Sequence, residues 1–554
     1  MATPQAPRPW QAPLLLGLIL VLAAGLRVVG LGWGLPNASH LFSYHPDEYF
    51  SLMAVWSYAL GQGDLNPHFF NYGTLYLYLV LGAALIAGHA PFASADEIAQ
   101  RMGSLVLDAR LVTVVLGVLT VLLVYLTGKR LYDARAGLWA ALVLAIMPLH
   151  AVHGHYATVD VPATFWMMLC LFFAARILRE QGSRLLWAYG AAGAAAGLAA
   201  ATKYNAGLAI LFPLVAHAAV AVRGRQEHSL WRLMVSRRLA LCLAALVVAF
   251  LIACPWPLLS FQEWWGSLTQ YNSVAYELHH MRVGEQPTLA ATPHGLIFHF
   301  TRSLAYGCTW PLLILTLAGV ALALRRRTKA DWVLLVFLFA WYVMIGLAKV
   351  RYMRYAMPLL PVLALLAGRL LHELLASASP RRLALRAVAV VCMACVLFAA
   401  AYTASYDRAL AAPAEQDRAL EALLPHLSPQ TTVGTIWPLW FCHPPLDYVN
   451  GGRILNTRWR QFSRPLADVR SVGYSVEPRP EIMIVTRIEL RDHLVAGTEE
   501  AQQLSEAERG GTSLHVHHVS PEERALRRFV NLDAAPQDWL YPFPGIWAFR
   551  PAGR

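Results

Sequence analysis

Long apolar runs recur along the chain from residue 12 to residue 403, and short polar connections separate them. Many of these runs approach the ~20 residues that a helix needs to cross a bilayer. The pattern predicts about 11 membrane-spanning helices, at residues 12–34, 111–127, 137–152, 161–178, 185–202, 204–222, 239–260, 304–324, 331–348, 355–375 and 387–403. One further apolar stretch, 73–90, is predicted to lie in the membrane interface or to re-enter, because its tyrosines suit that depth.

The last 151 residues have a different pattern. Two runs rich in β-branched residues, 431–437 and 481–486, predict strands, and residues 416–424 and 499–507 predict helices. The aromatic segment 539–549 predicts a closing strand or an aromatic cover. The predicted fold is therefore an all-α polytopic membrane bundle over residues 1–403 with a small soluble α/β domain over residues 404–554. That domain fits a structural cap over the outer face of the bundle or a part that recognises a substrate.

Composition supports this division. The chain is 57% hydrophobic and only 14% charged, against roughly 25% in ordinary soluble domains. Residues 1–403 hold 29 Lys and Arg and 15 Asp and Glu, a net of +14, whereas residues 404–554 hold 16 and 18, a net of −2. The basic excess belongs to the membrane part, so the charge does not indicate nucleic-acid binding. The seven cysteines show neither a disulfide framework nor zinc spacing.

Basic residues gather in alternate connections, which predicts the topology. Cytoplasmic connections should carry the excess of Lys and Arg. One set of connections holds Lys129 to Arg135, Arg176 to Arg184, Arg223 to Arg238, Arg325 to Lys329 and Arg381 to Arg386, and it is predicted to be cytoplasmic. The N-terminus then lies inside, and the first external loop (35–110) and the C-terminal domain lie outside. We expect a multi-pass protein of the cytoplasmic (inner) membrane. Counting 73–90 as a span would invert every later loop.

Polar groups are concentrated at the predicted outer ends of the helices. They comprise Asp47, Glu48, Arg110, His150, His153, His155, Asp160, Lys203, Lys349, Arg351 and Arg354. Adjacent carboxylates at a membrane helix exit are costly unless they face water or act in function. Cations at headgroup depth suit an anionic ligand such as a lipid phosphate. A carboxylate can take the proton of an attacking hydroxyl, and fixed cations can stabilise a leaving phosphate. The constellation therefore fits group transfer from a lipid phosphate to a hydroxyl.

Each of these residues also has a simpler interpretation. Asp47 and Glu48 fit a solvated loop, and the arginines fit anchors that extend to the interface. Asp160 fits the N-cap of a helix that continues with Val161-Pro162. The histidines fit a metal site, but their spacing matches no HExxH-type motif. No P-loop or Gly-rich dinucleotide fingerprint occurs.

Five short motifs follow one another along residues 12–375. They are His45-Pro46-Asp47-Glu48-Tyr49, Ala109-Arg110-Leu111, His153-Gly154-His155-Tyr156-Ala157-Thr158-Val159-Asp160-Val161-Pro162, Ala201-Thr202-Lys203-Tyr204-Asn205 and Arg351-Tyr352-Met353-Arg354-Tyr355-Ala356-Met357-Pro358. Together these motifs resemble the GT-C glycosyltransferases. More specifically they are similar to family 39, which contains protein O-mannosyltransferases and has the lipid A aminoarabinose transferases as relatives. The resemblance implies a GT-C helix bundle whose first external loop carries amphipathic helices and the acidic pair.

The resemblance also implies roles for single residues. Asp47 would be the catalytic base and Glu48 its neighbour in the acceptor or sugar site. The carrier phosphate would contact Arg110, Lys203, Arg351 and Arg354, with Asp160 as a sugar-side or supporting carboxylate. Contacts to acceptor or sugar are expected from His45, His153, His155 and Tyr352. No cofactor is assigned, and a divalent metal is left open because its ligands do not map onto this chain.

The implied reaction moves a mannose-like or related sugar from a polyprenyl-phosphate donor to a hydroxyl on the outer face. The acceptor class stays open between protein, lipid and glycan, and the other expected partners are membrane lipids. The alternative is a transporter or flippase of a lipid-linked anionic glycan precursor. A transporter would use the same cations but needs charged or broken helices at mid-membrane.

Overall fold

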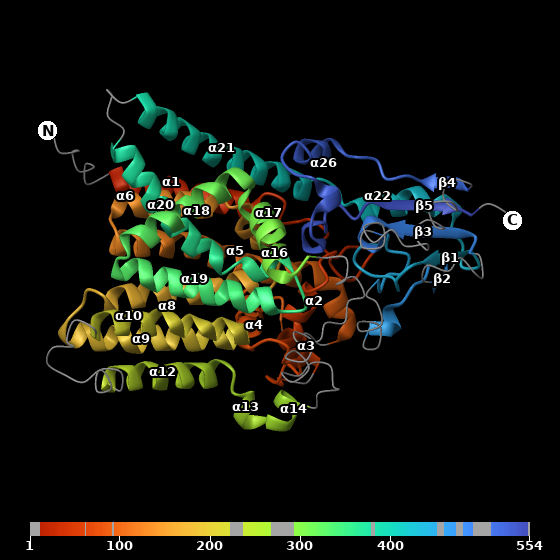
Figure 1. Ribbon diagram of the computed structural model, residues 1–554. Coiled ribbons are helices and arrows are strands. Elements are labelled where there is room, and N and C mark those ends of the chain that lie inside the picture. Colours follow the sequence, from red (N-terminus) through yellow and green to blue (C-terminus); the bar gives the residue numbers. More distant parts are fainter. Residues whose placement is uncertain are drawn as a thin grey trace.

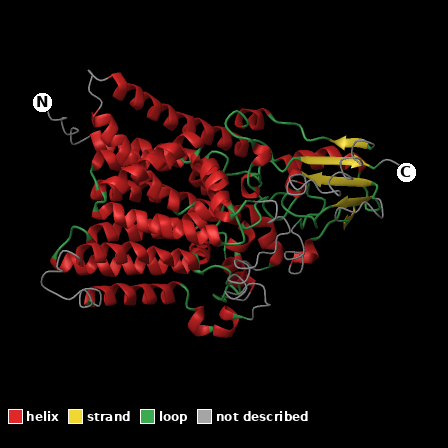
Figure 2. Cartoon of the chain, viewed as in Figure 1, coloured by secondary structure: helices red, strands yellow, loops and turns green. Residues whose placement is uncertain are grey.

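The computed structural model describes residues 11–60, 63–90, 94–221, 236–266, 293–377, 383–450, 459–472, 480–490 and 511–551 of the 554-residue chain. Long helices lie side by side in a bundle, and a small sheet lies beyond one end of it (Figures 1 and 2). The principal helices are α1 (Gln11–Val28), α5 (Ala95–Leu131), α6 (Ala134–Ile146), α8 (Asp160–Ile177), α9 (Gly182–Thr202), α10 (Leu211–Ala221), α12 (Arg237–Ala253), α18 (Trp310–Arg326), α19 (Lys329–Leu347), α20 (Leu359–Ser377) and α21 (Leu383–Ala411).

The described residues contain eight helices long and apolar enough to cross a membrane, and two bent helix pairs raise the number to ten. The helix α12 has 17 residues, which is near the lower limit of about 17 for a spanning helix. The predicted polytopic bundle is confirmed, and its count of 11 is approximate because it depends on α12.

Two predicted spans are not continuous helices. The span predicted at 137–152 bends by 64° between α6 and the short α7 (Pro148–Val152). Pro148 lacks an N–H and holds Met147 in an extended conformation, which ends α6. The span predicted at 304–324 bends by 110° at Thr309, between α17 (Ala305–Cys308) and α18. Thr309 has a φ of 70°, which is incompatible with a right-handed helix. Each of these two predicted spans is therefore a bent pair of helices.

The first external loop contains the short helices α2 (Glu48–Ser51), α3 (Met53–Leu60) and α4 (Leu75–Ile86). The apolar stretch 73–90 forms α4, whose 12 residues extend about 18 Å and cannot cross a bilayer. The Ser94 side chain caps α5 by accepting a hydrogen bond from the backbone N–H of Glu97. Arg110 therefore lies inside a 37-residue helix and not at its first turn.

Small residues bring α9 and α12 into close contact. A Cβ atom at Gly193 would lie 1.9 Å from the carbonyl oxygen of Cys242, and one at Gly197 would lie 2.2 Å from that of Leu246. Glycine at these positions lets the two backbones approach, as in other membrane helix pairs. This contact fixes α9, which ends immediately before Lys203.

The C-terminal domain is built on a five-stranded mixed sheet with the order β2-β1-β3-β5-β4. The strands are β1 (Thr432–Thr435), β2 (Asp468–Ser471), β3 (Ile482–Thr486), β4 (Thr512–His515) and β5 (Ile546–Arg550). Strand β1 pairs in parallel with β2 and β3, whereas β5 pairs antiparallel with β3 and β4. One face of the sheet packs against α22 (Glu415–Leu423). The predicted α/β type is confirmed, and the helix predicted at 499–507 lies outside the described residues.

Charge is distributed unequally between the two ends of the bundle. The helix α5 begins in the first loop, near the sheet domain, and ends about 55 Å further along its axis at Lys129 and Arg130. We propose that this basic end is cytoplasmic and that the C-terminal domain is outside.

This topology predicts the behaviour of reporter fusions. Alkaline phosphatase, which needs an oxidising compartment, should be active when fused after Ala412 and inactive when fused after Glu180, between α8 and α9. The opposite result would reverse the orientation.

The C-terminal domain also predicts a pH dependence. Burial lowers the pKa of His517, but hydrogen bonds to Glu415 and Glu523 outweigh it and raise the pKa to about 9. The pKa of this histidine in the unfolded chain is ~6.5. The pairing therefore stabilises the fold fully below that pH, and this stabilisation is lost as the pH rises through about 9. The Tm should fall between pH 7 and pH 10, and His517→Gln should reduce that fall. An equal fall in both proteins would contradict this role.

Candidate active site

The adjacent carboxylates Asp47 and Glu48 point to different partners. Glu48 is fully buried and accepts two 2.8 Å hydrogen bonds from Arg110, one from Nε and one from Nη2. The backbone N–H of Ala157 donates to Glu48 at 2.8 Å. Burial raises the pKa of Glu48, but Arg110 more than offsets this and holds the pKa below its usual range. Arg110 also donates to the carbonyls of Leu31 and Trp33.

This pair joins four segments of the chain: the end of α1, α2, α5 and the turn before α8. Arg110 is 1% exposed and donates to four acceptors within the protein. The geometry favours a positioning role for Arg110 and Glu48 over the carrier-phosphate contact that the sequence predicts for Arg110.

Asp47 begins a chain of opposite charges that runs through Arg354 and Asp160 to Lys203. The Asp47 carboxylate lies 3.0 Å from the Nη2 atom of Arg354, and the Nε atom of Arg354 lies 3.8 Å from Asp160. Asp160 accepts a 2.8 Å hydrogen bond from Lys203 Nζ. The Asp47 side chain is 20% exposed, against 6% for Asp160 and 0% for Glu48. Asp47 is therefore the most accessible of the three carboxylates.

The local sequence explains how these side chains converge. Asp47 precedes α2, and Asp160 is the first residue of α8. Lys203 is the extended residue that ends α9, and Arg354 lies in the short helix η6 (Met353–Ala356) between α19 and α20. The four charged residues thus lie where helices begin, end or are connected, all at one end of the bundle, and this brings them together.

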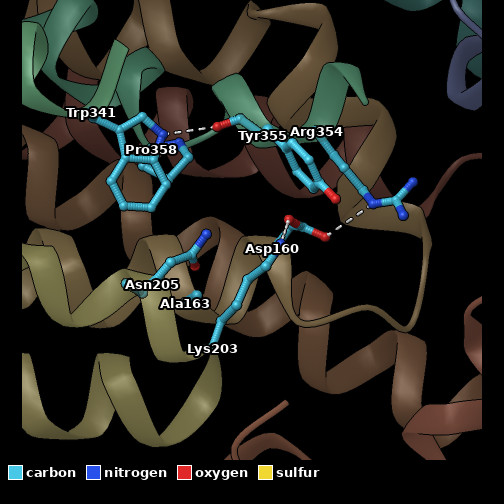
Figure 3. A pocket seen from close by; sticks show the side chains of 9 residues that line it. Asp160, Ala163, Lys203, Asn205, Trp341, Arg354, Tyr355 and Pro358 are labelled. Carbon is cyan, nitrogen blue, oxygen red and sulfur yellow. Dashed lines mark hydrogen bonds and ion pairs between the residues drawn. The ribbon is translucent and has the colours of Figure 1, made fainter. Parts of the chain in front are cut away.

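Arg354 and Lys203 line a small cavity. The cavity is lined by Asp160, Ala163, Lys203, Asn205, Ala206, Trp341, Arg354, Tyr355 and Pro358. Figure 3 shows Asp160 between the two cations, with the rings of Trp341 and Tyr355 on the other side of the cavity. Lys203 Nζ lies 5.1 Å from the centre of the Tyr355 ring. An anionic group with an apolar extension suits this lining.

The other predicted residues divide between the site and its support. His45 is buried between Tyr156 and Tyr541, with ring centres 4.4 and 4.6 Å away. Burial lowers the pKa of His45 to about 4, and its Nδ1 accepts a 3.2 Å hydrogen bond from the backbone N–H of Asp47. His45 is therefore neutral at pH 7.

His153 is also buried, and its ring meets Tyr156 edge-on at 5.7 Å. His155 contacts the carbonyls of Val29, Ala151 and Val152, so it supports the turn.

The loop before η6 carries the two remaining candidates. The Tyr352 ring lies 4.0 Å from Arg354 Cζ, where it supports the guanidinium. Arg351 lies three residues before Arg354 and is half-buried, but it does not line the cavity.

One residue of the site comes from the C-terminal domain. The Asp538 carboxylate accepts 3.1 Å hydrogen bonds from the backbone N–H groups of Met353 and Arg354. Burial raises the pKa of Asp538. This contact leaves no signal in the sequence, because Asp538 belongs to no motif and is 184 residues away from Arg354.

The question of a divalent metal, which the sequence leaves open, stays open. Within the described ranges, no three His, Cys, Asp or Glu side chains are grouped so that they could hold a metal ion.

The chain is similar to enzymes of known name. Residues 98–256 match the family described as dolichyl-phosphate-mannose-protein mannosyltransferase. The chain is 28% identical over 388 residues to undecaprenyl phosphate-alpha-4-amino-4-deoxy-L-arabinose arabinosyl transferase 1 of Pseudomonas fluorescens, covering 69% of this chain and 63% of that protein. A transferase of the same kind from Pseudomonas paraeruginosa is 32% identical over 238 residues, covering 42% of this chain and 39% of that protein. The chain thus matches less than two thirds of the length of these relatives.

Two solved structures share the fold. ArnT from Cupriavidus metallidurans bound to undecaprenyl phosphate superposes with a TM-score of 0.50 and 17% identity, covering 87% of this chain and 94% of that one. The archaeal oligosaccharyltransferase AglB from Archaeoglobus fulgidus, in complex with an inhibitory peptide and a dolichol-phosphate, superposes with a TM-score of 0.50 and 14% identity, covering 91% of this chain and 73% of that one. The GT-C fold that the sequence predicts is confirmed.

Substitution of the two adjacent carboxylates should lower the stability of the protein by unequal amounts. Glu48→Gln leaves the Arg110 charge buried without its counter-ion, which should cost about 3–5 kcal/mol. Asp47→Asn removes a partly exposed ion pair and should cost about 1 kcal/mol or less. Thermal unfolding of both purified variants measures the difference. Equal losses in Tm would show that Glu48 is not the structural member of the pair.

Proposed function

We propose that this chain, a GT-C fold member of glycosyltransferase family 39, transfers a sugar from a polyprenyl-phosphate donor to a hydroxyl acceptor. The observation that carries the proposal is the series of charges from Asp47 through Arg354 and Asp160 to Lys203 at the cavity. The partly exposed Asp47 carboxylate lies beside Arg354, and Lys203 follows on the other side of Asp160. A base and fixed cations of this kind are what the reaction needs.

The proposed reaction has one bond-forming and one bond-breaking event. The acceptor oxygen attacks the anomeric carbon of the sugar, and its proton passes to the Asp47 carboxylate. The bond between that carbon and the phosphate oxygen breaks, and the phosphate leaves with the electron pair. Arg354 and Lys203 stabilise the negative charge that develops on this oxygen.

The ion pair between Asp47 and Arg354 bears on donor binding. The Arg354 guanidinium lies 3.0 Å from the Asp47 carboxylate. A donor phosphate between Arg354 and Lys203 would compete with Asp47 for the guanidinium. Binding of the donor would thus release Asp47 to act as a base. Asp160 stays buried beside Lys203 and keeps this cation in place.

Apolar residues of the cavity suit the rest of the donor. Trp341, Tyr355 and Pro358 form its wall, and Trp341 donates from its indole N–H to the Tyr355 carbonyl at 2.9 Å. Such a fixed aromatic surface can pack against a prenyl chain or a sugar ring. We assign His45, His153 and Tyr352 to the sugar or acceptor side of the site, with Arg351 beside the carrier.

The relatives support a lipid-linked donor. Their names specify undecaprenyl phosphate carrying 4-amino-4-deoxy-L-arabinose, and the family description specifies dolichyl-phosphate-mannose. We therefore propose a polyprenyl-phosphate hexose or pentose as donor and a hydroxyl of a protein, lipid or glycan as acceptor. The reaction would take place on the outer face of the cytoplasmic membrane.

The transporter alternative is less well supported. Two helix pairs are indeed broken, at Met147 and Thr309. However, the first of these breaks leads into the turn that carries His153 and Asp160, so it has a use in building the site. The proteins to which the chain is similar are named transferases.

Asp47→Asn separates catalysis from binding. This change removes the base, so the rate of transfer should fall by about 10²–10⁴-fold. It also frees Arg354 from its competitor, so the variant should bind undecaprenyl phosphate at least as tightly as the wild type. A panel of radiolabelled polyprenyl-phosphate sugars with purified protein measures the transfer.

Two outcomes would count against the proposal. Full transfer by Asp47→Asn would remove Asp47 as the base. Transfer from no donor in the panel by the wild type would favour the transporter. A matched control is Asp108→Asn, a carboxylate of the same helix bundle that pairs with His89 and lies outside the cavity lining. It should keep wild-type transfer.

A further inference from the structure

The C-terminal domain reaches back into the site through one short segment. Its helix η10 (Gln537–Trp539) carries Asp538, which is 1% exposed. One oxygen of Asp538 accepts the backbone N–H of Met353, and the other accepts that of Arg354. The second oxygen also lies 3.8 Å from Arg354 Nη1. Asp538 thus holds the backbone of η6 more closely than it holds the guanidinium.

The same segment contacts the loop that carries the proposed base. The Tyr541 ring meets His45 edge-on, with ring centres 4.6 Å apart. His45 in turn accepts the backbone N–H of Asp47. Residues 538–541 therefore contact Arg354 directly and are linked to Asp47 through His45.

The segment is itself fixed to the membrane bundle. Trp539 donates from its indole N–H to Tyr402 at 2.8 Å, and Tyr406 donates to the Trp539 carbonyl at 2.8 Å. Arg302 donates to the carbonyl of Ala534, and Tyr306 donates to that of Asn531. Such fully hydrogen-bonded buried contacts make a rigid support.

We propose that Asp538 and Tyr541 are positioning residues of the active site, with Asp538 holding the backbone of Arg354, and that Trp539 between them docks the segment on the membrane bundle. The inference rests on the proposed function and goes beyond it, because the C-terminal domain is then needed for donor binding and is more than a cap.

The hydrogen bonds between Asp538 and the backbone of η6 matter when Arg354 changes its anionic partner. When a phosphate replaces Asp47, Arg354 loses the ion pair that fixes its guanidinium. The backbone of η6 does not depend on that pair, since its two N–H groups are held by Asp538. Arg354 can therefore change its anionic partner while its backbone stays in place. Preorganisation of this kind reduces the cost of binding.

The test compares Asp538→Asn with Asp533→Asn in the full-length protein. Asp533 lies five residues before Asp538, but it is 65% exposed and pairs with Arg527. In Asp538→Asn the Kd for undecaprenyl phosphate and the KM for the sugar donor should rise about tenfold or more, because a charged acceptor of two backbone N–H groups is lost. Asp533→Asn should keep both values. Asp538→Glu, which keeps the carboxylate, should recover part of the loss.

Two further variants separate positioning from domain docking. Trp539→Phe removes the hydrogen bond to Tyr402 and leaves Asp538 unchanged, so it should lower Tm but keep the Kd. Tyr541→Leu removes the ring against His45 and should lower kcat more than it raises KM. Tyr541→Leu also keeps the inference testable if Asp538→Asn fails to fold.

The inference is overturned if Asp538→Asn binds undecaprenyl phosphate like Asp533→Asn. It is also overturned if Trp539→Phe weakens binding as much as Asp538→Asn, which would assign the segment to docking alone. These binding measurements do not require transfer. If the wild type transfers no sugar, the proposed function fails, and a selective loss of carrier binding in Asp538→Asn would still support the positioning role.

Discussion

A buried carboxylate must be paired, and the Glu48–Arg110 pair meets this constraint in the first external loop. Removing both charges from water is costly, so the pair persists only where other groups satisfy its remaining donors and acceptors. The carbonyls of Leu31 and Trp33 and the N–H of Ala157 do so. Three segments are thereby held against α5. Asp47 takes its position from this anchor, since it directly precedes Glu48 in the chain.

Arg354 has the complementary role, because it pairs with groups that it can exchange. Asp47 binds it at 3.0 Å, while Asp160 and Asp538 lie 3.8 Å away. A guanidinium that faces several carboxylates keeps its charge and retains partners when one is replaced by phosphate. The rigid pair and the exchangeable pair use adjacent residues, Glu48 and Asp47. The first fixes the geometry of the site, and the second supplies its chemistry.

Hydropathy and charge were sufficient to predict the helix bundle, the α/β tail and the face on which the polar residues gather. The two helix breaks differ in how far the sequence predicts them. Pro148 is a local signal for the break after Met147, whereas the φ of 70° at Thr309 does not follow from its residue type. The sequence also could not separate Asp47 from Glu48, since neighbouring residues in a turn point in different directions and only tertiary contacts decide their partners. The apolar pattern predicts Arg110 at the start of a helix, because the first turns of α5 are polar and the helix is longer than its apolar part. Asp538 could not be found, since its contact joins two distant segments without a motif.

The central claim is that Arg354 exchanges Asp47 for the carrier phosphate. A structure of the protein with bound undecaprenyl phosphate tests it most directly. The account predicts the phosphate within hydrogen-bonding distance of both Lys203 Nζ and the Arg354 guanidinium, with the contact between Asp47 and Arg354 broken. A phosphate bound elsewhere, with that 3.0 Å contact intact, would contradict the account.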